Sequence, residues 1–105
     1  MLDDQEIISS YPLSQAIADG VVVEVFKNRW SELTGGKPLV ATRGVYSEFS
    51  LAAIREIWNE FVEWNTKVKE TLPEEEQLFA TRMNDKKIWV LEDIQAYTIL
   101  FPDEY

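Results

Sequence analysis

The feature that most constrains this chain is a long amphipathic segment that begins at Ser50. Apolar residues recur there at steps of three and four, the period of one helix face: Leu51, Ile54, Trp58, Phe61, Val62 and Val68. Ser50 can cap the first turn and Pro73 forbids continuation, so we predict a helix over about 50–71 that spans roughly 30 Å. A helix with one apolar face must bury that face against another layer.

Strand-like segments supply that layer. Residues 21–26 are β-branched and apolar on both faces as far as Glu24, which predicts a strand well inside a sheet. The C-terminal third contains three further strand-like runs, at 77–83, 88–91 and 96–101. Asn84 and Asp85 tolerate a left-handed backbone, so a tight hairpin is expected between the first two of these runs.

Together these elements predict an α+β fold in a single two-layer domain. We expect an antiparallel sheet of about four strands, covered by the long helix, plus short N-terminal helices at 12–18 and 27–33. Ser10 can cap the first of these and Gly20 can stop it. Residues 39–43 fit either a short strand or an extended lead-in, because Pro38 forbids helix before them and Gly44 ends them.

The chain is expected to form one domain over 1–105. It has no internal repeat and no linker, and disorder is considered for residues 1–10 alone. Those residues carry Asp3, Asp4 and Glu6 without Lys or Arg, the opposite of the start of a secretory signal. No apolar run approaches the ~20 residues of a membrane-spanning helix. We therefore expect a cytoplasmic protein with no membrane contact.

The composition excludes most common catalytic groups. The chain has no His and no Cys, so an imidazole base, a thiol nucleophile and a zinc site built on those ligands are excluded. The run Glu74, Glu75 and Glu76 matches no metal loop and fits a solvated charge run. The net charge of −9 makes direct nucleic-acid binding unexpected. We predict no catalytic residue, no cofactor and no metal.

Three segments are distinctive in combination. Residues 15–25 begin Gln-Ala-Ile-Ala-Asp-Gly-Val-Val-Val, residues 39–43 read Leu-Val-Ala-Thr-Arg, and residues 97–104 end in Ile-Leu-Phe-Pro-Asp-Glu. Their order and spacing resemble those of a family of small uncharacterised bacterial proteins from plasmids, phages and other mobile elements, one of the numbered domains of unknown function. The helix at 50–71 differs in composition from that family. The resemblance supports the expected fold and implies no catalytic residue.

A basic stretch interrupts this acidic sequence. Between residues 21 and 44, four basic side chains stand against two acidic ones, and the basic ones are Lys27, Arg29, Lys37 and Arg43. With the backbone amides of Gly35 and Gly36, these cations could form a small anion site or an interaction surface. The alternative is that each pairs with a nearby Glu.

Two further candidates concern contacts. Four Trp residues cannot all be central in so small a core, so we expect at least one to be exposed. Trp64, at the border of the helix's apolar face, is the first candidate for an interaction anchor, and cover by neighbouring Lys or Glu stems is the alternative. Asp19 is predicted to pair with Arg43 and so fix the first helix to the sheet, although a helix stop alone explains Asp19 and Gly20.

Three functions stay open at this point. A non-enzymatic interaction or accessory module, with a protein partner or a second copy of the chain, fits the aromatic, acidic sequence best. The alternative is a DNA-mimicking inhibitor of a nuclease or restriction system, which needs a continuous carboxylate stripe. A small carboxylate-dependent enzyme is least favoured, because it needs a cavity that holds two convergent acids.

Overall fold

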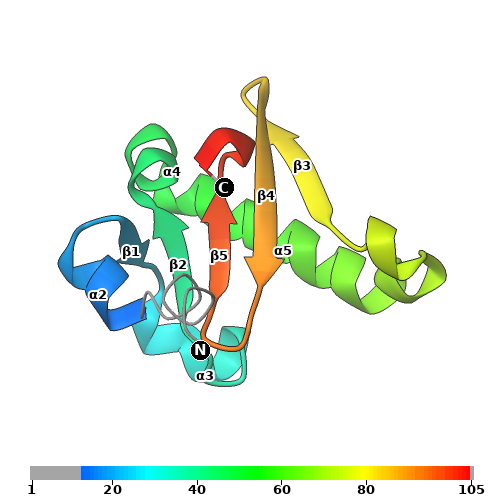
Figure 1. The fold of residues 1–105 in the computed structure, drawn as a ribbon, viewed down its shortest axis with the longest axis horizontal. Coiled ribbons are helices and arrows are strands. Elements are labelled where there is room, and N and C mark those ends of the chain that lie inside the picture. The colour runs from blue at the N-terminus through cyan, green and yellow to red at the C-terminus, as the bar shows by residue number, and fades with distance from the viewer. Residues whose placement is uncertain (1–12, 105) are drawn as a thin grey trace, which may run out of the picture.

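The computed structural model describes residues 13–104, which form a five-stranded sheet with a long helix across one face (Figure 1). The strands are β1 (Val22–Glu24), β2 (Leu39–Thr42), β3 (Phe79–Met83), β4 (Lys86–Glu92) and β5 (Tyr97–Leu100). The α-helices are α2 (Leu13–Ala18), α3 (Trp30–Leu33), α4 (Arg43–Glu48) and α5 (Leu51–Lys67). Single 3₁₀ turns lie at Lys27–Arg29, Lys69–Thr71, Glu74–Glu76 and Pro102–Glu104. The α+β class is confirmed, whereas the predictions for residues 1–10 and for Pro12 lie outside the described residues.

The sheet differs from the expected four antiparallel strands. Its order is β1-β2-β5-β4-β3, and every neighbouring pair is antiparallel except β2 and β5, which run parallel. The segment at 39–43, for which a strand and a lead-in were both open, supplies the additional strand β2. All four residues of β2 are buried. Burial on both faces removes the alternation that normally identifies a strand, so the local sequence could not decide this point.

β1 lies at the edge of the sheet, so the prediction of an interior strand over 21–26 is wrong. Val22 packs with α2 on one face, while Val25, just after the strand, joins the main core on the other. An edge strand whose two faces are both covered has the same apolar pattern as an interior one. Phe26 then adopts a left-handed φ of 54°, which ends the extended run.

α5 is the predicted long helix, but it ends earlier than expected. The Ser50 hydroxyl caps it by accepting a hydrogen bond from the Ala53 amide at 3.1 Å. The helix ends at Lys67, and the chain reaches Thr71 in a 3₁₀ turn. Its buried stripe is Ile54, Ile57, Trp58 and Phe61, an i, i+3, i+4, i+7 set. Leu51, Val62 and Val68, which were expected in that stripe, are exposed.

The sheet has an apolar cluster on each face. The larger cluster lies between the sheet and α5, and the smaller one joins α2 to Val22, Val40 and Ala96. Alternation along β4 directs Ile88 and Val90 toward α5 and leaves Trp89 on the opposite face. On that opposite face α2 lies over β1, at the far side of the sheet from β3 (Figure 1).

α4 was not expected, because Gly44 was interpreted as the end of an extended segment. The structure makes Thr42 the N-cap of a short helix, and its hydroxyl accepts a hydrogen bond from the Val45 amide at 3.3 Å. The hairpin between β3 and β4 is confirmed as a tight turn. Asn84 and Asp85 have φ values of 55° and 68°, which is the conformation of a type I′ hairpin.

Candidate functional site

The second half of α5 and the start of β3 enclose a small cavity, which we call the α5 cleft. Its volume is about 140 Å³. Three aromatic side chains form its floor, Phe61, Trp64 and Phe79, and polar side chains contribute to its rim, Asn65, Lys69, Gln77 and Glu92. The cleft lies where β3 separates from β4, since their ladder ends at the pair Phe79 and Val90.

Aromatic packing holds the floor of the α5 cleft in place. The Trp64 ring centroid lies 6.0 Å from that of Phe61 and 5.6 Å from that of Phe79. Phe61 meets Phe79 edge-on at 5.7 Å. Both Phe side chains are buried, and Trp64 is half-buried between them and the opening. The three rings therefore present a supported apolar surface.

The expectation of an exposed Trp is wrong for this chain. Trp58 is buried, and Trp30, Trp64 and Trp89 are half-buried. Trp30 satisfies its indole N–H by donating to the Val25 carbonyl at 2.9 Å, which removes the physical reason for exposure at that position. Trp64 packs on the rings of Phe61 and Phe79, and cover by Lys or Glu stems stays an alternative. Its role as an interaction anchor stays a prediction.

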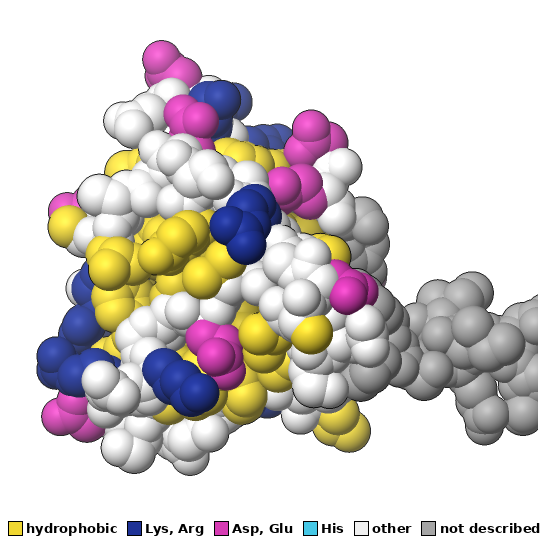
Figure 2. Space-filling view, turned by 90° about the vertical axis from the view of Figure 1, so that its left-hand side faces the viewer, with side chains coloured by type: hydrophobic (Ala, Val, Ile, Leu, Met, Phe, Trp, Pro, Cys, Tyr) yellow, Lys and Arg dark blue, Asp and Glu magenta, His cyan; other side chains and the backbone are white. Residues whose placement is uncertain are grey.

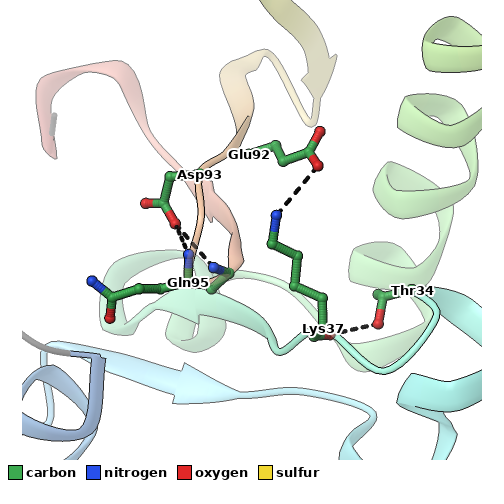
Figure 3. Close-up of polar contacts among 6 residues, drawn as sticks. Thr34, Lys37, Glu92, Asp93 and Gln95 are labelled. Atoms are coloured by element: carbon green, nitrogen blue, oxygen red, sulfur yellow. Dashed lines mark hydrogen bonds and ion pairs between the residues drawn. The ribbon is translucent and has the colours of Figure 1, made fainter.

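A charged pair stands at one end of the cleft. Lys37 Nζ lies 3.3 Å from Glu92 Oε2 and 4.9 Å from the ring centroid of Tyr97. Figure 3 shows Lys37 reaching from the loop before β2 toward Glu92 at the end of β4. Burial raises the pKa of the Tyr97 hydroxyl, and Glu92 raises it further through its charge and a hydrogen bond. Tyr97 therefore stays protonated near neutral pH.

Local hydrogen bonds fix the backbone on both sides of this pair (Figure 3). Asp93 Oδ1 accepts from the amides of Gln95 and Ala96 at 2.8 and 2.9 Å, which closes the turn between β4 and β5. Thr34 Oγ1 donates to the Lys37 carbonyl at 2.5 Å. Lys37, in the loop before β2, and Glu92, the last residue of β4, thus meet from constrained backbone.

The four basic candidates do not gather in one place. Three of them have carboxylate partners: Lys27 with Glu24 at 3.6 Å, Arg29 with Glu32 at 2.5 Å, and Lys37 with Glu92. Lys37 precedes β2 and Arg43 follows it, so ~20 Å of strand separates them at about 3.3 Å per residue. The geometry favours pairing over a shared anion site, and an interaction role for Arg29, Lys37 and Arg43 stays a prediction.

Arg43 does connect the first helix to the sheet. Its Nε donates to the Gly20 carbonyl at 3.1 Å, and its backbone amide donates to the Val21 carbonyl at 3.0 Å. The Asp19 carboxylate accepts a hydrogen bond from Gln15 Nε2 at 3.0 Å. The expected connection is therefore present through backbone carbonyls, and an ion pair between Asp19 and Arg43 stays a prediction.

Each of three cavities in the described part of the chain is lined by a single carboxylate. The α5 cleft contains Glu92, a second cavity beside β4 contains Asp103, and a third beneath α2 contains Asp93. Within residues 13–104, no three acidic side chains converge as a metal site. On the side of the molecule in Figure 2, basic, acidic and apolar side chains are interspersed, whereas a DNA mimic needs a carboxylate stripe.

Trp64 and Lys37 were candidates from the sequence, whereas Phe61, Phe79 and Glu92 were not recognised as parts of one site. Glu92 is 55 residues from Lys37 in the chain, and no local pattern connects them. The hydrophobic runs that contain Phe61 and Phe79 predict core positions, not the margin of a cleft.

Comparisons with known proteins found no match to this chain among family models, curated proteins or solved structures. The resemblance to the mobile-element family therefore stays a prediction. Across residues 13–104, no helix is both long and apolar enough to span a bilayer.

Proposed function

We propose that this chain is a non-enzymatic protein-interaction module that takes an apolar side chain of a partner into the α5 cleft. The observation that carries the proposal is the half-buried Trp64, which lies on the buried rings of Phe61 and Phe79 at the wall of a cavity. Aromatic residues that become fully desolvated in the complex supply much of the binding free energy of protein interfaces.

The size of the cleft supports a side chain as its occupant. At about 140 Å³ it is smaller than the roughly 300–1,000 Å³ of typical small-molecule sites. One Leu or Phe side chain would fill it. Leu78 and Val68 are 41% and 40% exposed, and they extend the apolar surface beside Trp64. Val68 follows Trp64 by four residues and so lies on the same side of the helix.

Charge narrows the class of partner. Residues 60–78, which supply six of the ten residues that line the cleft, contain six acidic and two basic side chains. A partner segment with Lys or Arg beside its apolar anchor would complement this surface, and the opposite charges would speed encounter. We therefore expect the partner to present a large apolar residue within a basic segment.

Selection from a random peptide library tests the proposal. Wild-type protein should recover peptides that share a large apolar residue flanked by Lys or Arg. Trp64→Ala should weaken those peptides about tenfold or more, because it removes an interface anchor. The matched control is Leu51→Ala, which removes a 50% exposed apolar side chain at the other end of α5 and should change the affinity less than about twofold.

Two results would count against this function: no peptide is recovered, or the recovered peptides bind Trp64→Ala as tightly as the wild type. Circular dichroism of both variants checks that they are folded. Sedimentation equilibrium over a range of concentrations addresses a homo-oligomer. A dimer that dissociates in Trp64→Ala would identify a second copy of the chain as the partner.

A further inference from the structure

The β3–β4 hairpin places two cations directly opposite each other. Arg82 and Lys87 are partners in the antiparallel ladder, so their side chains share one face, with Cβ atoms about 4.5–5.5 Å apart. Both side chains are exposed, and within residues 13–104 neither pairs with a carboxylate. Arg82 Nη1 donates to the backbone carbonyl of Asp85 at 3.3 Å. Like charges opposite each other destabilise a sheet, so the free protein contains an unrelieved repulsion.

An aromatic surface continues from these cations. The next residues on the same face are Ala80 and Trp89, which are also ladder partners. This face points away from α5, because Thr81 on the other face donates to Glu60 of that helix at 2.6 Å. Ala80 is exposed and Trp89 is half-buried. Figure 1 shows the hairpin extending beyond the rest of the sheet.

An open cavity adjoins this hairpin. Its volume is about 370 Å³, and it is lined by Lys86, Lys87, Phe101, Pro102 and Asp103. Lys86 already has partners, since its Nζ lies 3.8 Å from Glu48 and 5.8 Å from the centroid of the Phe101 ring. Phe101 packs on Phe49 in the cluster beneath α5, so the floor of this cavity lies on the other face of the sheet, and Lys87 is the residue that the cavity and the cation pair share.

We propose that this hairpin surface, made of Ala80, Arg82, Lys87 and Trp89, binds an acidic segment of a partner protein. Carboxylates of that segment would form charge-assisted hydrogen bonds with Arg82 and Lys87. A large apolar side chain beside them would lie against Trp89, which shares their face. Binding would also relieve the repulsion between the two cations, so the complex recovers stability that the free fold lacks.

Charge complementarity selects a short acidic segment over nucleic acid. The whole chain has a net charge of −9, which opposes a long polyanion at distances up to the Debye length. A short segment contacts the hairpin alone, and its apolar residue adds binding that does not depend on charge. The hairpin surface shares no residue with the α5 cleft, so this proposal does not rest on the cleft.

The probe is a labelled peptide, Glu-Asp-Glu-Phe-Glu-Asp-Glu, titrated with wild-type protein at low salt. We expect the double variant Arg82→Gln with Lys87→Gln to weaken binding about tenfold or more. The matched control, Arg55→Gln with Lys67→Gln, removes the same charge from α5 and should stay within about twofold of the wild type. The peptide Gln-Asn-Gln-Phe-Gln-Asn-Gln should bind about tenfold more weakly than the acidic one.

The proposal is overturned if the acidic peptide does not bind the wild type, or if it binds both double variants equally well. A single-stranded oligothymidylate provides the comparison with nucleic acid. The proposal is also overturned if this oligonucleotide binds the wild type more tightly than the peptide does and loses affinity in the Arg82→Gln, Lys87→Gln double variant. Circular dichroism establishes that each double variant is folded, so a loss of binding reports on the surface.

Discussion

The Glu104 carboxylate accepts a hydrogen bond from Thr42 Oγ1 at 2.6 Å and another from the Phe101 amide at 2.9 Å. Thr42 is also the N-cap of α4, so this contact joins the last turn of the described chain to the end of β2. The segments at 15–25, 39–43 and 97–104 meet in this part of the fold, where β1, β2 and β5 are neighbours. These three segments therefore stabilise one another in the fold.

Glu104→Ala should lower the free energy of unfolding by about 1–2 kcal/mol, because it removes the acceptor of two hydrogen bonds. Urea unfolding of the variant measures this change. Asp103→Ala removes the adjacent exposed carboxylate and should change the free energy of unfolding by less than about 0.5 kcal/mol. Equal effects of the two substitutions would contradict the role of the Thr42 contact.

The effect of Gly44→Ala on the free energy of unfolding should have opposite signs in the wild type and in Glu104→Ala. A Cβ at Gly44 would overlap Glu104 Oε2 and displace the carboxylate from Thr42, so the substitution destabilises the wild type. In Glu104→Ala that conflict is absent, and Ala then stabilises α4 by up to about 1 kcal/mol relative to Gly. A double-mutant cycle by urea unfolding measures the coupling. A coupling energy near zero would show that the two residues do not interact.

Gly20→Ala should destabilise the protein more than Gly35→Ala does. Both glycines have left-handed φ values, +76° and +74°, so Ala is strained at either position by about 1 kcal/mol. A Cβ at Gly20 would also lie 3.2 Å from Arg43 Nη2, whereas nothing lies within 4 Å of one at Gly35. Thermal unfolding compares the two variants. Equal melting temperatures would show that the Arg43 side chain does not limit the space at Gly20.

Arg82→Thr should raise the free energy of unfolding by about 0.2–1 kcal/mol, since it removes a like-charge pair and places a β-branched residue in a strand. Arg82→Lys is the control, because it keeps the repulsion with Lys87 and should leave stability near the wild-type value. Urea unfolding at low salt gives the comparison. The gain should shrink when salt screens the charges, and a gain that is independent of salt would exclude repulsion as its cause.

Tyr97 makes stability depend on pH in the alkaline range. Burial raises the pKa of its hydroxyl above the ordinary value of about 10, and the charge and hydrogen bond of Glu92 act in the same direction. The folded state therefore favours the protonated form. Its contribution is complete below about pH 10 and is lost as the pH rises through the folded-state pKa.

Tyr97→Phe should therefore differ most from the wild type near neutral pH, and the difference in the free energy of unfolding should decrease at alkaline pH. Urea unfolding at a series of pH values measures it. Ultraviolet absorbance of tyrosinate in the folded protein should show one group that titrates late. A difference between the two proteins that stays constant with pH would contradict the raised pKa.

Local chemistry determined several elements of this protein. The stripe of α5, the Ser50 cap and the turn at Asn84 and Asp85 depend on residues within a few positions of one another, so the sequence alone predicts them. The opposition of Arg82 and Lys87 also follows from that turn, because a two-residue hairpin sets the register of its strands. The turn residues in the sequence are therefore sufficient to predict that Arg82 lies opposite Lys87.

Only the tertiary structure decided the strand order, the parallel pairing of β2 with β5 and the edge position of β1. The same holds for the α5 cleft and for the meeting of Lys37 with Glu92. Each depends on segments far apart in the chain, whose approach follows from the burial of shared apolar surface. A local apolar pattern indicates that a residue is buried, but it does not indicate which segment covers it. The candidate site of this protein depends on which segments cover one another.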